Sequence, residues 1–245
     1  MSFKSRKQVR NLLIFFSKLI TYFKFILVRL FILSHGDVEK KFSLIYKLRY
    51  WSGTDKARSV SGYGSEEITT KNISRDLEIF LKDYKIESML DLPCGDFNWM
   101  KKINLDNIKY IGGDIVPDLI SENKKKFESK NISFIKLDIL KDSLPSVDLI
   151  FTRDCFIHLS NMDIIEALKN VKKSKSKYFA TTSFNSNTIL NNDIKTGDFR
   201  FINLESSPFN LPKPEKILND SFDNKDLNYS KKSILIWKVD NLNYD

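Results

Sequence analysis

Residues 90–99 read Leu-Asp-Leu-Pro-Cys-Gly-Asp-Phe-Asn-Trp, and residues 110–115 read Tyr-Ile-Gly-Gly-Asp-Ile. Each stretch begins as an apolar run and then reaches glycine and an acid, which is typical of a buried strand that ends at a turn. In open α/β sheets, ligands bind beyond the carboxyl ends of the strands. A turn at Gly95 lets backbone approach a ligand, and Asp114, about 20 residues on, accepts hydrogen bonds from ribose hydroxyls. The two stretches together predict a nucleoside pocket.

Apolar runs alternate with helical patterns along the middle of the chain. Residues 67–84, 118–129 and 162–172 have helical spacing, and residues 233–239 form a closing apolar strand. This alternation predicts an α/β fold with a mostly parallel sheet and helices on both faces. The other expected strands are 88–92, 108–114, 132–137, 147–152 and 178–182.

The net charge of +9 is concentrated near the N-terminus of the 245-residue chain. Residues 1–50 hold 11 Lys and Arg against 2 Asp and Glu, whereas residues 51–245 hold 29 of each. The body therefore has no basic excess for phosphate backbones, and no nucleic-acid partner is expected. Cys94 and Cys155 lack the spacing of metal ligands, so we expect reduced thiols in a cytoplasmic protein and no metal site.

The chain divides into a basic amphipathic helical segment, residues 1–50, and a domain over residues 51–245. Within residues 4–33, basic residues alternate with bulky apolar ones, and a helical projection gathers the polar residues into an arc of about 140°. Such a helix lies on an anionic membrane, which predicts peripheral attachment at the inner membrane face. The polar arc consists of Arg10, Asn11, Ser17, Lys18, Thr21, Lys24 and Arg29.

Other readings of the N-terminal segment stay open. Residues 12–33 would be the window for a spanning helix, but three basic residues interrupt it. Residues 31–36 make a poor signal-peptide cleavage site. The helix would otherwise pack on the protein's own body or on a partner. After a break at residues 35–37, residues 38–50 predict a short amphipathic helix.

Over about residues 50–240, the sequence resembles class I S-adenosylmethionine-dependent methyltransferases. Four motifs in the family's order carry the resemblance, at residues 90–95, 113–115, 137–139 and 148–151. The resemblance implies a Rossmann-like fold with a mostly parallel seven-stranded sheet. A narrower likeness is to a bacterial branch with the patterns DxPCGDFxW, RDCxxHL and NxDxxxGxxR, here at residues 91–99, 153–159 and 191–200.

The resemblance implies S-adenosyl-L-methionine as the cofactor. Gly95 would face it, with Asp91 or Asp96 near its ammonium group. Asp114 would hold the ribose hydroxyls and Asp138 would approach the adenine amine, although each acid could instead cap the next helix. The expected cofactor-binding residues are Asp91, Pro93, Cys94, Gly95, Asp96, Trp99, Asp114, Ile115, Asp138 and Ile139.

A loop over residues 51–65 precedes the first helix of the domain. Its 61–65 stretch, Ser-Gly-Tyr-Gly-Ser, forms either a backbone nest or a plain turn. Trp51 and Tyr63 either stack over the cofactor or serve in packing.

Arg153, Asp154 and His158 follow the expected fourth strand, where the resemblance points the transferred methyl group. Asp154 with a raised pKa, or His158 with a pKa near 6.5, suits a general base. Arg153 suits bidentate binding of an acidic substrate group. The alternative is that Arg153 and Asp154 order the loop while His158 packs on the following helix.

Asn192, Asp193 and Arg200 are expected to hydrogen-bond a polyhydroxylated acceptor, although Asn-Asn-Asp also suits an Asx turn. We therefore expect methylation of a hydroxyl of a sugar or cell-surface glycan at the membrane face. One alternative is a nucleotide- or nicotinamide-dependent oxidoreductase, which the absence of a GxGxxG stretch disfavours. Another is a non-catalytic membrane-associated adaptor with a degenerate cofactor fold, because Pro93 stands where the family has its first glycine.

Overall fold

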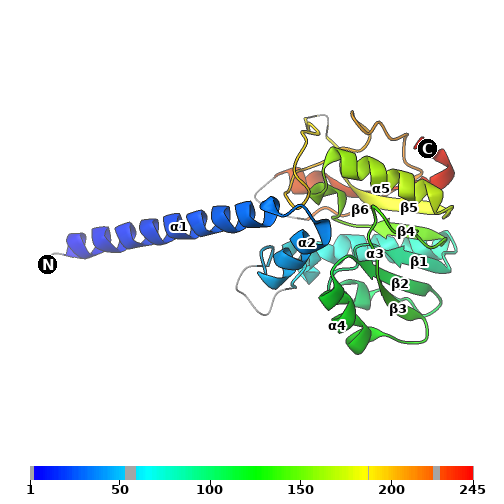
Figure 1. Cartoon of the computed structure of the whole chain (residues 1–245), viewed down its shortest axis with the longest axis horizontal. Coiled ribbons are helices and arrows are strands. Elements are labelled where there is room, and N and C mark those ends of the chain that lie inside the picture. The colour runs from blue at the N-terminus through cyan, green and yellow to red at the C-terminus, as the bar shows by residue number, and fades with distance from the viewer. Residues whose placement is uncertain (1–2, 53–58, 187, 223–226, 245) are drawn as a thin grey trace.

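The computed structural model describes residues 3–52, 59–186, 188–222 and 227–244. They form a seven-stranded sheet in the order β3-β2-β1-β4-β5-β7-β6, in which β7 runs in the direction opposite to the other six strands (Figure 1). This confirms the expected mostly parallel sheet. The strands are β1 Ser88–Asp91, β2 Lys109–Asp114, β3 Ile132–Lys136, β4 Leu149–Thr152, β5 Tyr178–Phe184, β6 Lys216–Asn219 and β7 Lys232–Lys238.

Local signals place the helix ends close to the expected ones. Asp37 caps the second helix by accepting a hydrogen bond from the Lys40 amide, and Ser160 caps the fifth in the same way. Pro117 stands in the first turn of the fourth helix, where its missing N–H costs nothing. The helices are α1 Phe3–Ser34, α2 Val38–Lys47, α3 Glu67–Asp83, α4 Pro117–Phe127 and α5 Asn161–Lys173.

Alternation along the strands builds one core on each face of the sheet. Leu149 and Phe151 of β4 pack in the same cluster as Leu77 of α3, whereas Ile150 packs in the cluster that holds Leu168 of α5. Successive side chains of a strand point to opposite faces, so a strand buried on both faces is apolar throughout. The two cores hold the strand ends, and therefore the turns that follow them, in place.

Strand β6 is not among the strands expected from the sequence. It has four residues and lies at the sheet edge, and three of the four are exposed. A short edge strand has one neighbour and little apolar surface to bury, so its sequence carries almost no periodic signal.

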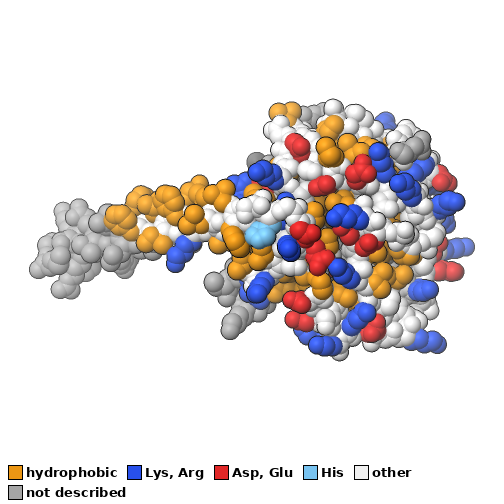
Figure 2. Space-filling view, in the orientation of Figure 1, with side chains coloured by type: hydrophobic (Ala, Val, Ile, Leu, Met, Phe, Trp, Pro, Cys, Tyr) orange, Lys and Arg blue, Asp and Glu red, His pale blue; other side chains and the backbone are white. Residues whose placement is uncertain are grey.

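Helix α1 projects from the body, which confirms the expected helix over residues 4–33 (Figure 1). Its C-terminal part is attached: Arg29 forms an ion pair with Asp198, Phe25 stacks on Tyr50 with ring centroids 4.8 Å apart, and Ile32 is buried. Within the described residues, no helix is both long and apolar enough to cross a membrane. Large apolar side chains are exposed along α1 (Figure 2): Phe15, Phe16, Leu19, Ile20, Tyr22, Phe23, Phe25, Leu27, Leu30 and Phe31.

Candidate functional site

A cavity of about 280 Å³ opens at the carboxyl ends of β1, β2 and β4. The order of the strands reverses at β1, between β2 and β4, and this is the position where open α/β sheets bind ligands. All ten residues expected to bind a cofactor line the cavity, and so do the three expected to act in catalysis. Asn192, Asp193 and Arg200 are not among its lining residues.

Gly95 and Asp114 meet at one edge of the sheet, as the two opening stretches predict. The Gly95 amide donates to Oδ2 of Asp114 over 3.1 Å, and the Val116 amide donates to Oδ1 over 3.0 Å. Gly95 has a φ of +55°, a conformation that glycine adopts easily. Burial raises the pKa of Asp114 to about 6, although the backbone hydrogen bonds oppose this.

Two further acids lie in this part of the cavity. Asp91 is buried and accepts a 2.6 Å hydrogen bond from the Tyr110 hydroxyl, and its burial raises its pKa to about 7. Burial also raises the pKa of Asp138. Among the described residues, no Lys or Arg forms an ion pair with Asp91, Asp114 or Asp138. We call residues 91–96, 114–115 and 137–140 the cofactor half.

Asp96 is engaged by the protein itself. Its carboxylate accepts hydrogen bonds from the Ser59 hydroxyl over 2.6 Å, the Val60 amide over 2.9 Å and the Ser61 hydroxyl over 3.2 Å. A Cβ at Gly95 would lie 2.3 Å from Oγ of Ser61. The close approach that a glycine allows is therefore used by Ser61, and the loop around residues 59–65 covers the turn after β1.

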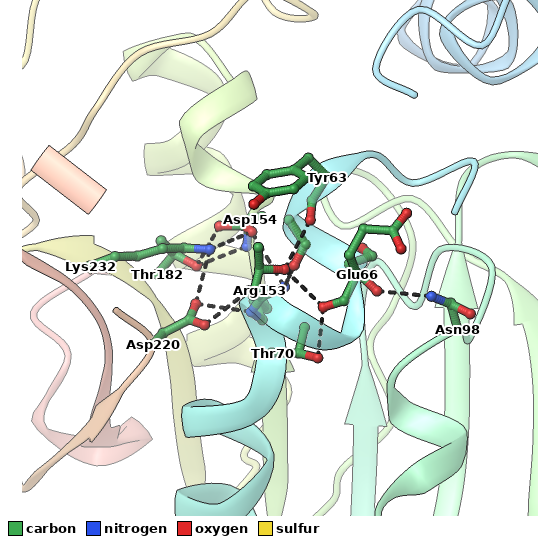
Figure 3. Close-up of polar contacts among 12 residues, drawn as sticks. Tyr63, Glu66, Thr70, Asn98, Arg153, Asp154, Thr182, Asp220 and Lys232 are labelled. Carbon is green, nitrogen blue, oxygen red and sulfur yellow. Dashed lines mark hydrogen bonds and ion pairs between the residues drawn. The ribbon is translucent and has the colours of Figure 1, made fainter. Parts of the chain in front are cut away.

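After the end of β4, Arg153, Asp154, Asp220 and Lys232 form a charge quartet (Figure 3), and all of these except Asp220 line the cavity. Nε and Nη2 of Arg153 each donate to Asp220 over 2.9 Å, and Nη1 donates to the Gly64 carbonyl over 2.8 Å. Lys232 lies 2.6 Å from Asp154 and 3.0 Å from Asp220. Arg153 was expected to bind an acidic substrate group in a bidentate way, but its bidentate hydrogen bonds go to Asp220.

The pKa of Asp154 differs from the expectation of a raised value. Burial raises it, but Lys232 and Arg153 outweigh burial and hold the pKa at about 2. Asp154 has a φ of +55°, and its amide donates to Oγ1 of Thr182 over 2.8 Å. Its carboxylate is therefore an ionised hydrogen-bond acceptor and a weak base.

His158 has the properties of a proton acceptor. Its Nδ1 lies 2.7 Å from the Asp198 carbonyl oxygen, which can only accept, so Nδ1 carries the hydrogen. Burial lowers the pKa of His158, so the ring is neutral at pH 7. In a neutral ring with Nδ1–H, Nε2 keeps a lone pair. The ring stacks on Trp51, with centroids 4.6 Å apart, and lines the cavity.

The residues expected to bind the acceptor lie instead around the start of α5. Oδ1 of Asp193 accepts from the Asn161 amide over 2.7 Å, and Nη2 of Arg200 donates to the Asn161 side chain over 2.9 Å. Asn192 is exposed. The structure does not bring these three residues to the cavity.

Several residues of the site have no signal in the sequence. Lys232 begins an apolar strand and follows another lysine. Asp220 lies in a polar stretch, which is typical of an exposed segment. Both are buried because the antiparallel strand β7 carries Lys232 next to the end of β6. Four aromatic side chains that the sequence does not single out also line the cavity, together with the expected Tyr63: Phe184, Phe199, Phe222 and Tyr229.

No protein-family model matches the sequence, and no curated protein matches it. Solved structures do match. The CMeT domain of the citrinin polyketide synthase aligns with a TM-score of 0.54 at 12% identity, over 82% of this chain and 65% of that one. The methyltransferase domain of bacterial CtHen1-CN aligns with a TM-score of 0.53 at 13% identity, over 69% and 99%.

A third match is the PH0226 protein from Pyrococcus horikoshii OT3, with a TM-score of 0.51 at 18% identity, over 71% of this chain and 94% of that one. This chain spans just under two thirds of the polyketide synthase chain. The chain has the Rossmann-like fold of class I methyltransferases, which confirms the expected fold class.

Proposed function

We propose that this chain is an S-adenosylmethionine-dependent methyltransferase. The observation that carries the proposal is the pairing of Gly95 with Asp114 where the strand order reverses, beside buried acids that form no ion pair within the described part of the chain. A buried carboxylate is costly unless it is neutralised or paired, so such a pocket favours a ligand with positive charge. In this role Asp114 holds the ribose hydroxyls, Asp138 faces the adenine amine and Asp91 lies toward the ammonium group.

The acceptor half, residues 153–158 with Lys232 and the surrounding aromatic side chains, suits transfer to a hydroxyl. When bound, the cofactor supplies a methyl group on a sulfonium sulfur, which leaves as a neutral thioether. Nε2 of His158 takes the proton of the acceptor hydroxyl, whose oxygen forms the new bond to carbon. Asp154, whose pKa of about 2 keeps it ionised near neutral pH, accepts a hydrogen bond that holds the acceptor and does not compete for this proton.

The balance of charge in the acceptor half favours an uncharged, polyhydroxylated acceptor. The two cations and two anions of the quartet neutralise one another, so an acidic acceptor would find no free cation there. Aromatic walls with a few polar groups are typical of sites for small organic ligands. We therefore infer that the acceptor is a hydroxyl of a sugar or a cell-surface glycan.

Two measurements test the proposed activity. Calorimetry with S-adenosylmethionine and, separately, with NADP should show binding of the first alone; binding of NADP would favour an oxidoreductase, and binding of neither an adaptor. Labelled methyl groups should then be transferred to a cell-envelope glycan extract. His158→Gln should lower this turnover by about 10²- to 10⁴-fold while cofactor binding is retained. Unchanged turnover would remove His158 as the base.

We also infer that α1 attaches the enzyme to the inner face of the membrane, with a cytoplasmic body. Its C-terminal part uses Arg29, from the polar arc, to contact the body, whereas the apolar side chains Phe23 and Leu27 are 57% and 64% exposed. Apolar side chains on one side of a helix and basic residues on the other suit an anionic lipid surface. The acceptor would then meet the enzyme at the membrane.

Vesicle flotation tests this attachment. The full chain should float with anionic vesicles and much less with zwitterionic ones. Phe23→Glu combined with Leu27→Glu should abolish flotation. Ile68→Glu combined with Ile79→Glu is the matched control, since it changes the charge equally at two exposed apolar residues of α3. Flotation of the α1 variant at the control's level would contradict the inference.

A further inference from the structure

We propose that residues 193–200, here named the brace, position His158 as the base and fix its tautomer. The proposal rests on the proposed function and gives a role to the pattern Asp193–Gly197–Arg200, which the cavity itself does not use. The brace lies against residues 157–161, which carry His158 from the end of β4 toward α5. Apart from Phe199 and the contacts that hold His158, the members of the brace do not line the cavity, so they are positioning residues.

Backbone amides of the brace donate hydrogen bonds to the carbonyls of His158 and of the residue before it. The Gly197 amide donates to the His158 carbonyl over 2.8 Å, and the Arg200 amide donates to the Ile157 carbonyl over 3.0 Å. Between these two bonds, the Asp198 carbonyl accepts the ring Nδ1–H over 2.7 Å. Three successive hydrogen bonds therefore fix both the main chain and the ring of His158.

Side chains of the brace also accept hydrogen bonds from amides at the start of α5. Oγ1 of Thr196 accepts from the Ser160 amide over 2.9 Å, and Oδ1 of Asp193 accepts from the Asn161 amide over 2.7 Å. Amides at a helix start have no partner within the helix, so these acceptors satisfy donors that would otherwise be left open. His158 is thus tied to the helix that follows it as well as to the brace.

The turn at Gly197 makes this geometry possible. Its φ of +100° is one that side chains rarely adopt, while a Cβ there would meet Leu33 at 3.6 Å, an ordinary contact. Position 197 therefore favours glycine because of its backbone conformation, and not because a side chain would lack space. The Gly197 amide and the Asp198 carbonyl, on either side of this turn, both face His158.

The chemical consequence concerns the two ring nitrogens. Because a carbonyl oxygen cannot donate, the brace requires the hydrogen on Nδ1 and leaves Nε2 as the acceptor. The ring planes of Trp51 and Phe199, with centroids 4.6 and 5.8 Å from that of His158, limit its rotation. A ring that turned or changed tautomer would present N–H to the acceptor hydroxyl and could not take its proton.

Nitrogen-15 NMR of the full chain tests the proposal without turnover. His35 is the only other histidine, so spectra are recorded in a His35→Gln background, where all ring signals belong to His158. The wild-type brace should give the tautomer with hydrogen on Nδ1. Gly197→Ala, and independently Thr196→Val, should add the tautomer with hydrogen on Nε2.

Turnover and pH profiles complete the test. Both brace variants should lower the methyl-transfer rate by about tenfold to a hundredfold, as misplacement of a reacting group does. They should also shift the low-pH limb of the rate profile, while calorimetric cofactor affinity stays within a factor of two. Gly36→Ala is the matched control, since a Cβ there meets nothing within 4 Å, and it should change neither spectrum nor rate.

The proposal is overturned if wild-type His158 carries its hydrogen on Nε2, or if both brace variants keep the wild-type tautomer and pH profile. Thr196→Val keeps the test decisive should Gly197→Ala fail to fold. His158→Gln reports on the proposed function separately. A fixed tautomer together with full activity of that variant would remove the base role but leave the geometry of the brace intact.

Discussion

The two halves of the cavity treat buried charge in opposite ways. In the cofactor half, Asp91 and Asp114 form no ion pair with the described residues, and their pKa values are raised to about 7 and 6. In the acceptor half, Asp154 is surrounded by Lys232 and Arg153, and its pKa falls to about 2. Under the proposed function, the acids of the first half meet a positively charged ligand, whereas the charges of the second half already neutralise one another.

The strongest way to break this comparison is to remove Asp220, the most buried member of the quartet. Asp220→Asn leaves Arg153 and Lys232 with one carboxylate between them. Breaking a buried ion pair costs about 3–5 kcal/mol, so the free energy of unfolding in denaturant should fall by that amount. Glu122→Gln is the control, because its pair with Lys126 is exposed and contributes at most about 1 kcal/mol. Equal losses in both variants would mean that the quartet is not a buried network.

A change in the cofactor half should act on binding instead. Asp114→Asn removes the charge that meets the ribose hydroxyls in the proposed function, and hydrogen bonds to charged groups contribute about 1.5–3 kcal/mol. Calorimetric affinity for S-adenosylmethionine should therefore drop by roughly 10- to 150-fold. Asp118→Asn, at an exposed position in the first turn of α4, should leave affinity unchanged. Retained affinity in Asp114→Asn would place the nucleoside elsewhere.

The pH dependence sharpens the comparison with a smaller effect. The folded-state pKa values of Asp91 and Asp114 lie above the ordinary value near 3.8, so these groups lower the free energy of unfolding as the pH rises from about 4 to 7. Cofactor binding needs both ionised forms, so affinity should fall by up to about tenfold per pH unit from pH 7 to 6, where Asp91 takes up its proton, and more steeply below pH 6, where Asp114 does so too. Constant affinity from pH 5 to 8 would contradict unpaired acids at the site.

Asp154 should respond to pH with the opposite sign. Its folded-state pKa lies below the unfolded value, so its stabilising contribution is present above about pH 4 and is lost as the pH falls toward 2. Denaturant titrations of the wild type and Asp154→Asn should therefore differ most above pH 4 and converge near pH 2. Curves separated by the same amount at every pH would argue against an ionised Asp154.

The sequence predicts that Gly95 and Asp114 meet because this part of the cavity is assembled over short distances along the chain. Gly95 and Asp114 end neighbouring strands about 20 residues apart, and apolar runs reveal both strands. Once the strands are parallel and adjacent, their ends meet without further information. The same reasoning places His158 and Asp154 after β4.

Only the tertiary structure decides the state of those two side chains. Lys232, which forms an ion pair with Asp154, lies 78 residues away along the chain. Asp198, whose carbonyl orients His158, lies 40 residues away. The sequence shows Asp154 but not the cation that folding brings to it. A raised pKa was therefore expected for Asp154, whereas Lys232 lowers it. Strand periodicity is a local property of the chain, whereas the charge around a buried group is set by long-range contacts.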